Sequence, residues 1–174
     1  MRRRELGRWA RLKRTLVVGY GNIYRRDDGV GPAVINALRA RQGKPALGPE
    51  EDGFDALGDA LDTLILHQLV PELAQTAADY DLIVFVDAHV GAWPEALHVE
   101  HLEACYKPPL VSHHIHPCTI LQLAGRLGGR QPAGILLSIY GHDFDFGEGL
   151  SAETAAAVPA AVEMILGWAQ GGAA

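Results

Sequence analysis

The chain has 174 residues, 48% of them hydrophobic, and a formal net charge of −6. Its length and composition indicate one globular domain with enough apolar residues for one core, and its acidic balance argues against a general nucleic-acid surface. The sequence contains no apolar stretch long enough for a membrane span and no signal-peptide pattern, and its two cysteines are not expected to form a disulfide framework, so we expect a cytoplasmic protein.

Residues 1–14 hold seven Lys or Arg and are predicted to be a flexible basic arm in front of one domain at 15–170. Short apolar runs rich in β-branched residues predict strands, whereas apolar positions recurring every three or four residues predict helices. The expected strands are 15–20, 61–66, 81–88, 96–102 and 135–140, and the expected helices are 31–41, 71–78, 117–127 and 151–169. This alternation predicts a single-domain, three-layer α/β fold: a twisted, mainly parallel sheet with helices on both faces.

Polar residues stand where several of these strands end. Asp28 lies in the turn after the first strand, His67 follows the second, and Asp87 closes the third. Because sites in parallel sheets lie beyond the carboxyl ends of the strands, we expect these residues to share one cleft.

The turn after the first strand opens like a dinucleotide-binding loop, but it does not fit that pattern. The third glycine of the fingerprint would fall on Tyr24, and the second strand is followed by His67 instead of an acid. Nucleotide binding is therefore disfavoured. The adjacent carboxylates of Asp27 and Asp28 cannot easily point the same way, so one can face the cleft while the other caps a helix or pairs with an arginine; both can also be surface caps.

Asp87 ends a continuously apolar strand, where a carboxylate needs a partner, either a structural one or a metal. Histidines gather at Ser112–Cys118, and imidazole is a common ligand for nickel and zinc, although a solvated loop is the alternative interpretation. Two carboxylates and one imidazole make an incomplete coordination set, which water or a partner protein would complete. His89 is interpreted as a surface residue, and Gln68 as a possible contact for a substrate backbone.

Several motifs, in order along the chain, resemble those of the hydrogenase maturation proteases. GYGNIYRRDDGVG at 19–31 resembles the signature G-x-G-N-x-x-x-x-D-[DE]-G-x-G. HQLVPELA at 67–74 and DLIVFVDA at 81–88 resemble the pattern of one branch of the family, and HHIHP at 113–117 matches its H-x-[apolar]-x-P segment. The basic arm departs from the family, whose members begin close to the first strand.

The resemblance implies an endopeptidase that removes a C-terminal extension from the large-subunit precursor of a nickel–iron hydrogenase after nickel insertion. Asp28 and Asp87 would be its catalytic residues, and they would recognise nickel carried by the substrate together with His113, with His114 as the alternative. Asn22 and Gln68 are the substrate-loop candidates. We expect a monomer with no nucleic-acid or membrane partner. The alternative function is a non-catalytic, metal-dependent checkpoint or chaperone that binds the large subunit.

Overall fold

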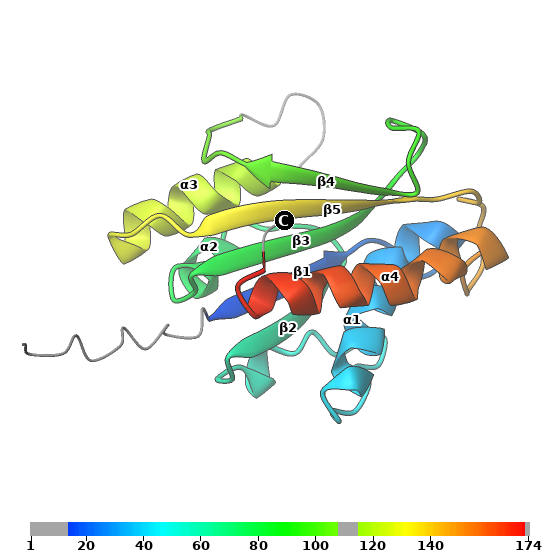
Figure 1. Ribbon diagram of the computed structural model, residues 1–174, viewed down its shortest axis with the longest axis horizontal. Helices are drawn as coiled ribbons and strands as arrows, with labels where there is room; N and C mark the ends of the chain where they lie inside the picture. The colour runs from blue at the N-terminus through cyan, green and yellow to red at the C-terminus, as the bar shows by residue number, and fades with distance from the viewer. Residues whose placement is uncertain (1–13, 108–114, 173–174) are drawn as a thin grey trace, which may run out of the picture.

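The computed structural model describes residues 14–107 and 115–172, and Figure 1 shows their arrangement. The predicted flexible arm, apart from Arg14, lies outside the described residues, as do His113 and His114. Among the described residues, no helix is both long and apolar enough to cross a membrane.

Five strands in the described part of the chain form one sheet in the order β2-β1-β3-β5-β4. The first four strands in that order pair in parallel, whereas β4 pairs with β5 in antiparallel register at the edge. The strands are β1 (Thr15–Tyr20), β2 (Leu61–Leu66), β3 (Leu82–His89), β4 (Leu97–Leu102) and β5 (Ala133–Tyr140). The predicted mainly parallel sheet is therefore confirmed.

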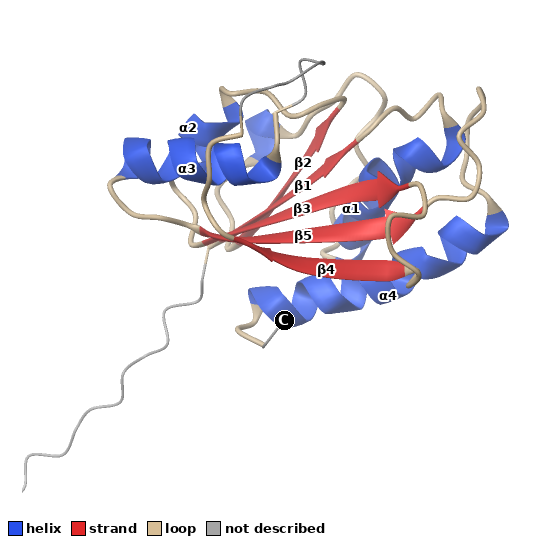
Figure 2. Ribbon diagram, turned by 90° about the horizontal axis from the view of Figure 1, so that it is seen from above, coloured by secondary structure: helices blue, strands red, loops and turns tan. Residues whose placement is uncertain are grey.

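Helices cover both faces of the sheet and produce the predicted three layers, and Figure 2 shows α2 and α3 on the side of the sheet away from α4. Helices α1 and α4 contact each other on one face, and α2 and α3 contact each other on the opposite face. The helices are α1 (Val30–Arg41), α2 (Leu73–Ala77), α3 (Pro117–Gly128) and α4 (Ala152–Ala169), with short 3-10 segments at Arg26–Gly29 and Phe54–Ala56.

Alternation along the central strands divides the core into two apolar clusters. On β3, Ile83 and Phe85 pack with the α2 and α3 side, whereas Val84 and Val86 pack with the α1 and α4 side. Successive side chains of a strand point to opposite faces, so a strand covered on both faces is apolar at every position. This explains why the runs 15–20 and 81–88 are recognisable in the sequence as buried strands.

The two cysteines depart from the expectation, because Cys105 and Cys118 form a disulfide. Cys105 follows the edge strand β4, Cys118 lies in the first turn of α3, and the amide of Cys105 donates a hydrogen bond of 3.2 Å to the carbonyl of Cys118. Nothing in the sequence pattern predicts that these two cysteines lie close together in space. Their pairing depends on how β4 and α3 sit in the fold.

Candidate functional site

Two carboxylates meet at the carboxyl edge of the sheet, as the strand-end argument predicts. Asp28 follows β1 and Asp87 belongs to the end of β3, and these strands are parallel neighbours in the sheet. Both half-buried side chains line the same two hollows, one of about 380 Å³ and one of about 480 Å³. The carboxylate pair therefore forms a shared wall between two open spaces.

Asp28 is held in place by the glycine turn that begins the first motif. Gly21 has a φ of +136°, and a β-carbon there would lie 2.0 Å from the carbonyl oxygen of Asp28. The backbone amide of Asn22 donates a hydrogen bond of 2.7 Å to Oδ2 of Asp28. Only glycine fits so close an approach in this backbone conformation, so the turn fixes the position of the carboxylate.

Asp87 is held by a half-buried tyrosine. The hydroxyl of Tyr20, the last residue of β1, donates a hydrogen bond to the Asp87 carboxylate, and the amide of Ala88 donates another of 2.8 Å. Burial raises the pKa of Tyr20 well above its usual value, and the neighbouring charge of Asp87 raises it further. Tyr20 therefore keeps its proton and remains a hydrogen-bond donor to Asp87.

Asp27 points away from the cleft and is fully buried. Its carboxylate accepts hydrogen bonds from the amides of His142, Asp143 and Ser151, at 2.7, 2.9 and 2.7 Å, and from the hydroxyls of Ser151 and Thr154, at 2.7 and 2.8 Å. Burial by itself would raise the pKa of Asp27, but these donors, led by Ser151, lower it far below its usual value. The two adjacent carboxylates therefore point in different directions, as the sequence predicts: Asp28 faces the hollows, and Asp27 is buried.

His67 and Gln68 lie at the same edge of the sheet. Both are exposed after β2, and both line the smaller hollow together with Asp28 and Asp87. We call this hollow the histidine cleft; His67, Gln68, Ile115 and His116 line it beside the two carboxylates. Gln68 thus lines the same hollow as the two carboxylates, and its contact with a substrate backbone stays a prediction.

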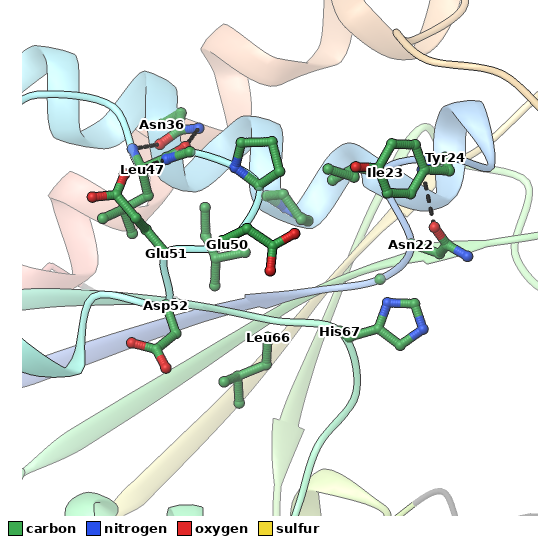
Figure 3. Close-up of a pocket in the computed structure, with 15 residues that line it drawn as sticks. Asn22, Ile23, Tyr24, Asn36, Leu47, Glu50, Glu51, Asp52, Leu66 and His67 are labelled. Carbon is green, nitrogen blue, oxygen red and sulfur yellow. Dashed lines mark hydrogen bonds between the residues drawn. The ribbon is translucent and has the colours of Figure 1, made fainter.

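A third hollow of about 550 Å³ continues beyond Gly21 and His67, which also line the histidine cleft. Figure 3 shows Glu50, Glu51 and Asp52 along one side of it, with His67 and Asn22 at the other end. The side chain of Asn22 accepts a hydrogen bond of 2.9 Å from the amide of Tyr24. Asn22 therefore contributes to the shape of its own turn as well as to the lining of this hollow.

His113 and His114 lie outside the described residues, so the choice between them stays a prediction. The third histidine of the segment, His116, is the N-cap of α3, and its Nδ1 accepts a hydrogen bond of 3.2 Å from the amide of Cys118. Burial lowers the pKa of His116, and the positive charge of Lys107 lowers it further. Sequence reasoning missed this capping role, although Pro117 at the first helical position was a signal for it.

His89 is buried, with 6% of its surface exposed, so its interpretation as a surface residue is wrong. Its ring stacks on Tyr140 at 5.3 Å between centroids and meets the edge of Trp93 at 5.1 Å. Burial lowers the pKa of His89, which favours the neutral ring. The residue follows Asp87 by two positions on β3, which places both side chains on the same face of the sheet.

Within residues 14–107 and 115–172, no three His, Cys, Asp or Glu side chains are grouped to hold a metal ion. Among the described residues, the reactive groups at the strand ends are therefore the carboxylates of Asp28 and Asp87. They lie in an open groove, and Asp87 accepts a hydrogen bond from Tyr20. Such a pair can bind part of a cation's coordination shell, or accept a proton from a water molecule that attacks a substrate.

Solved structures of hydrogenase maturation proteases are similar to this chain. The maturating endopeptidase HybD from Escherichia coli has a TM-score of 0.63 and 22% identity, covering 89% of this chain and 91% of its own. The maturation protease HybD from Thermococcus kodakarensis has a TM-score of 0.60 and 24% identity, covering 90% and 99%. A hydrogenase 2 maturation peptidase from Thaumarchaeota archaeon SCGC_AB-539-E09 has a TM-score of 0.57 and 24% identity, covering 88% and 96%.

No protein-family model and no curated protein matches the sequence. The likeness is therefore one of three-dimensional structure, and it extends over nearly the whole of the compared chains. It establishes that this protein has the α/β fold found in hydrogenase maturation proteases, which is the fold that its sequence motifs predict.

Proposed function

We propose that this protein is an endopeptidase that removes the C-terminal extension of a nickel–iron hydrogenase large-subunit precursor after nickel insertion. The observation that carries the proposal is the convergence of Asp28 and Asp87 on the shared wall of two hollows, in the fold of maturation proteases. The motifs around both residues resemble the same family, so the motifs and the fold support the same function.

In this proposal the two carboxylates recognise nickel that arrives with the substrate. Asp28 and Asp87 supply oxygen ligands, and His113, with His114 as the alternative, supplies an imidazole. Imidazole suits nickel, and the mixture of oxygen and nitrogen ligands leaves positions for the donors that the substrate already provides. In this proposal the protease supplies only part of the coordination shell, so it prefers a precursor that already carries nickel.

The residues of this chain also prepare the cleavage step. The hydrogen bond from Tyr20 fixes the orientation of the Asp87 carboxylate, and the glycine turn fixes that of Asp28. A carboxylate held beside the scissile bond can accept a proton from the attacking water and return it to the leaving amine. Gln68 and Asn22, at the two sides of His67, are the proposed contacts for the substrate chain.

The alternative proposal, a checkpoint or chaperone, uses the same metal recognition without cutting. Nickel-loaded and nickel-free precursor are each incubated with the protein, and intact mass and co-elution are measured. We expect the loaded precursor alone to lose a C-terminal peptide. Stable binding with no loss of mass would contradict the protease and support the checkpoint. A cytoplasmic location and a monomeric state stay predictions.

A further inference from the structure

The disulfide between Cys105 and Cys118 lies next to the histidine cleft. Cys118 is in the first turn of α3, and Cys105 follows the edge strand β4. The three residues directly before Cys118 line the cleft beside the two carboxylates, namely Ile115, His116 and Pro117. The disulfide therefore ties the segment that forms one wall of the cleft to the end of the edge strand.

Hydrogen bonds hold the same junction beside the covalent bond. The amide of Cys105 donates to the carbonyl of Cys118 at 3.2 Å, and the amide of Lys107 donates to Oγ1 of Thr119 at 3.1 Å. His116 caps α3 by accepting the amide of Cys118 at 3.2 Å. Because these contacts do not need the bond between the two sulfur atoms, breaking that bond should loosen the wall of the cleft without unfolding α3.

The two cysteines differ in exposure, and this gives thiol–disulfide exchange a direction. Cys118 is buried, with 2% of its surface exposed, whereas Cys105 is half-buried and is followed by the exposed residues Tyr106 and Lys107. An incoming thiolate therefore has access on the Cys105 side, and Cys118 is the leaving group. The thiolate of Cys118 forms in the first turn of α3, where the helix dipole stabilises a negative charge.

The rest of the fold indicates a redox role for this disulfide more than a role as a structural staple. Small secreted domains need disulfides because their cores are too small, whereas this chain buries an apolar cluster on each face of its sheet. In the cytoplasm, where we expect the protein, thiols are kept reduced, and the disulfides that do form there usually take part in catalysis or respond to the redox state. A disulfide beside the cleft is placed to report that state to the site.

We infer that the Cys105–Cys118 disulfide is a redox modification site, reduced by a dithiol, and that its state sets how firmly the wall of the histidine cleft is held. A thiolate of the dithiol attacks the sulfur of Cys105 to form a mixed disulfide, and Cys118 leaves as a thiolate and takes up a proton. The second thiol of the dithiol then displaces Cys105, so the dithiol is oxidised to a disulfide and the protein is reduced to two thiols. Cleavage is faster in the oxidised form, a consequence that rests on the proposed function.

The first test measures hydrogen exchange of the full chain in both states. One sample is reduced with dithiothreitol, which is then removed by anaerobic gel filtration, and the other is kept oxidised; alkylation and mass measurement count the free thiols. In the reduced form the amides of residues 115–121 should exchange about tenfold faster, whereas those of the central strand β1 should be unchanged. Equal exchange at 115–121 would overturn the inference, as would a disulfide that dithiothreitol does not open in the folded protein.

The second test measures cleavage of nickel-loaded precursor by the two forms, after the dithiothreitol has been removed so that it cannot act on the precursor. The reduced form should cleave about tenfold more slowly, as when a ligand loses the contacts that support it. The double variant Cys105→Ser with Cys118→Ser, treated identically, is the matched control and should show one rate with and without the treatment. Equal rates for the two wild-type forms, or the same change in the control, would overturn the inference. No cleavage by either form would instead contradict the proposed function, and the hydrogen exchange would still decide whether the disulfide holds the cleft wall.

Discussion

Asp27 and Asp28 are adjacent in the chain, and their surroundings give them opposite roles. Asp28 lies at an open groove, whereas Asp27 is fully buried and accepts five hydrogen bonds that join the first turn to the start of α4. An amide in place of the Asp27 carboxylate would turn an NH₂ group towards donors whichever way it rotated.

Asp27→Asn should therefore lower the free energy of unfolding by about 2–4 kcal/mol. Chemical denaturation at neutral pH measures this change. Asp55→Asn, at an exposed position, is the matched control and should change stability by less than about 0.5 kcal/mol. A loss in Asp27→Asn no larger than in the control would show that the buried carboxylate is not needed for the fold.

The same residue predicts a pH dependence. The pKa of Asp27 is lowered by folding, and in the unfolded chain it returns to about 3.9. Its contribution to stability is thus complete above that value and is lost as the pH falls below it, towards the lowered pKa of the folded state. Unfolding measured from pH 7 to pH 2 should show the difference between wild type and Asp27→Asn shrink below about pH 4. A constant difference across that range would contradict the account.

Tyr20 is predicted to act on the reaction through Asp87. Tyr20→Phe keeps the ring but removes the donor, so cleavage should slow by roughly tenfold, as for other residues that orient a ligand. Tyr80→Phe is a matched control, because it removes a buried tyrosine hydrogen bond of 2.7 Å to Asp62, away from the site. Both variants should lose about 1 kcal/mol of stability. Equal cleavage rates in the two variants would show that Tyr20 has only a structural role.

At the scale of single residues, sequence reasoning predicted Asp28, Asp87, His67 and Gln68 at one edge, and the structure brings these four together. It could not predict that His89 is buried, because the ring is covered by Trp93 and Tyr140, which come from a loop and from another strand. A contact such as that of His89 with Tyr140 on another strand leaves no periodic pattern in the sequence, so the sequence does not predict it. The roles of all site residues stay predictions.

At the scale of elements, the start of α1 packs unusually close to the sheet. A β-carbon on Gly31 would lie 2.7 Å from backbone atoms of both Tyr20 and Val86. Since a backbone cannot move aside as a side chain can, Gly31→Ala should cost about 2–4 kcal/mol of stability and displace the turn that carries Asp28.

Gly167→Ala is the control for this prediction. Gly167 lies inside α4, and an added β-carbon there would meet nothing within 4 Å. Alanine should stabilise that helix by up to about 1 kcal/mol. Thermal unfolding of the two variants should move in opposite directions. A Gly31→Ala protein as stable as wild type would disprove the close packing of α1 on β1 and β3.

The elements themselves were largely predictable because their signals are local. Apolar runs marked the buried strands, and apolar positions that recur every three or four residues marked the helices. The 3-10 segment at Arg26–Gly29 was not predicted, because its first residue takes a φ of +44°, which arginine adopts only when the surroundings impose it. The disulfide between Cys105 and Cys118 was missed because it depends on the packing of whole elements.

At the scale of the whole molecule, the site follows from the topology. The parallel order β2-β1-β3-β5 brings three strand ends with polar residues to one edge, and helices on both faces close the remaining surface of the sheet. Ligands of such folds bind where the strands end, so the fold itself selects the groove beside Asp28 and Asp87. What the groove acts on is a matter of its side chains, and the fold alone does not determine it.

The measurement that tests the central claim most directly is cleavage of nickel-loaded large-subunit precursor by Asp28→Asn and Asp87→Asn proteins. Each variant should lose about a hundredfold or more of the cleavage rate, because each removes a charge that the proposed reaction uses, while thermal unfolding stays close to that of wild type. Asp55→Asn should cleave normally. Wild-type cleavage by either site variant would contradict the account, because the carboxylate pair would then have no part in the reaction.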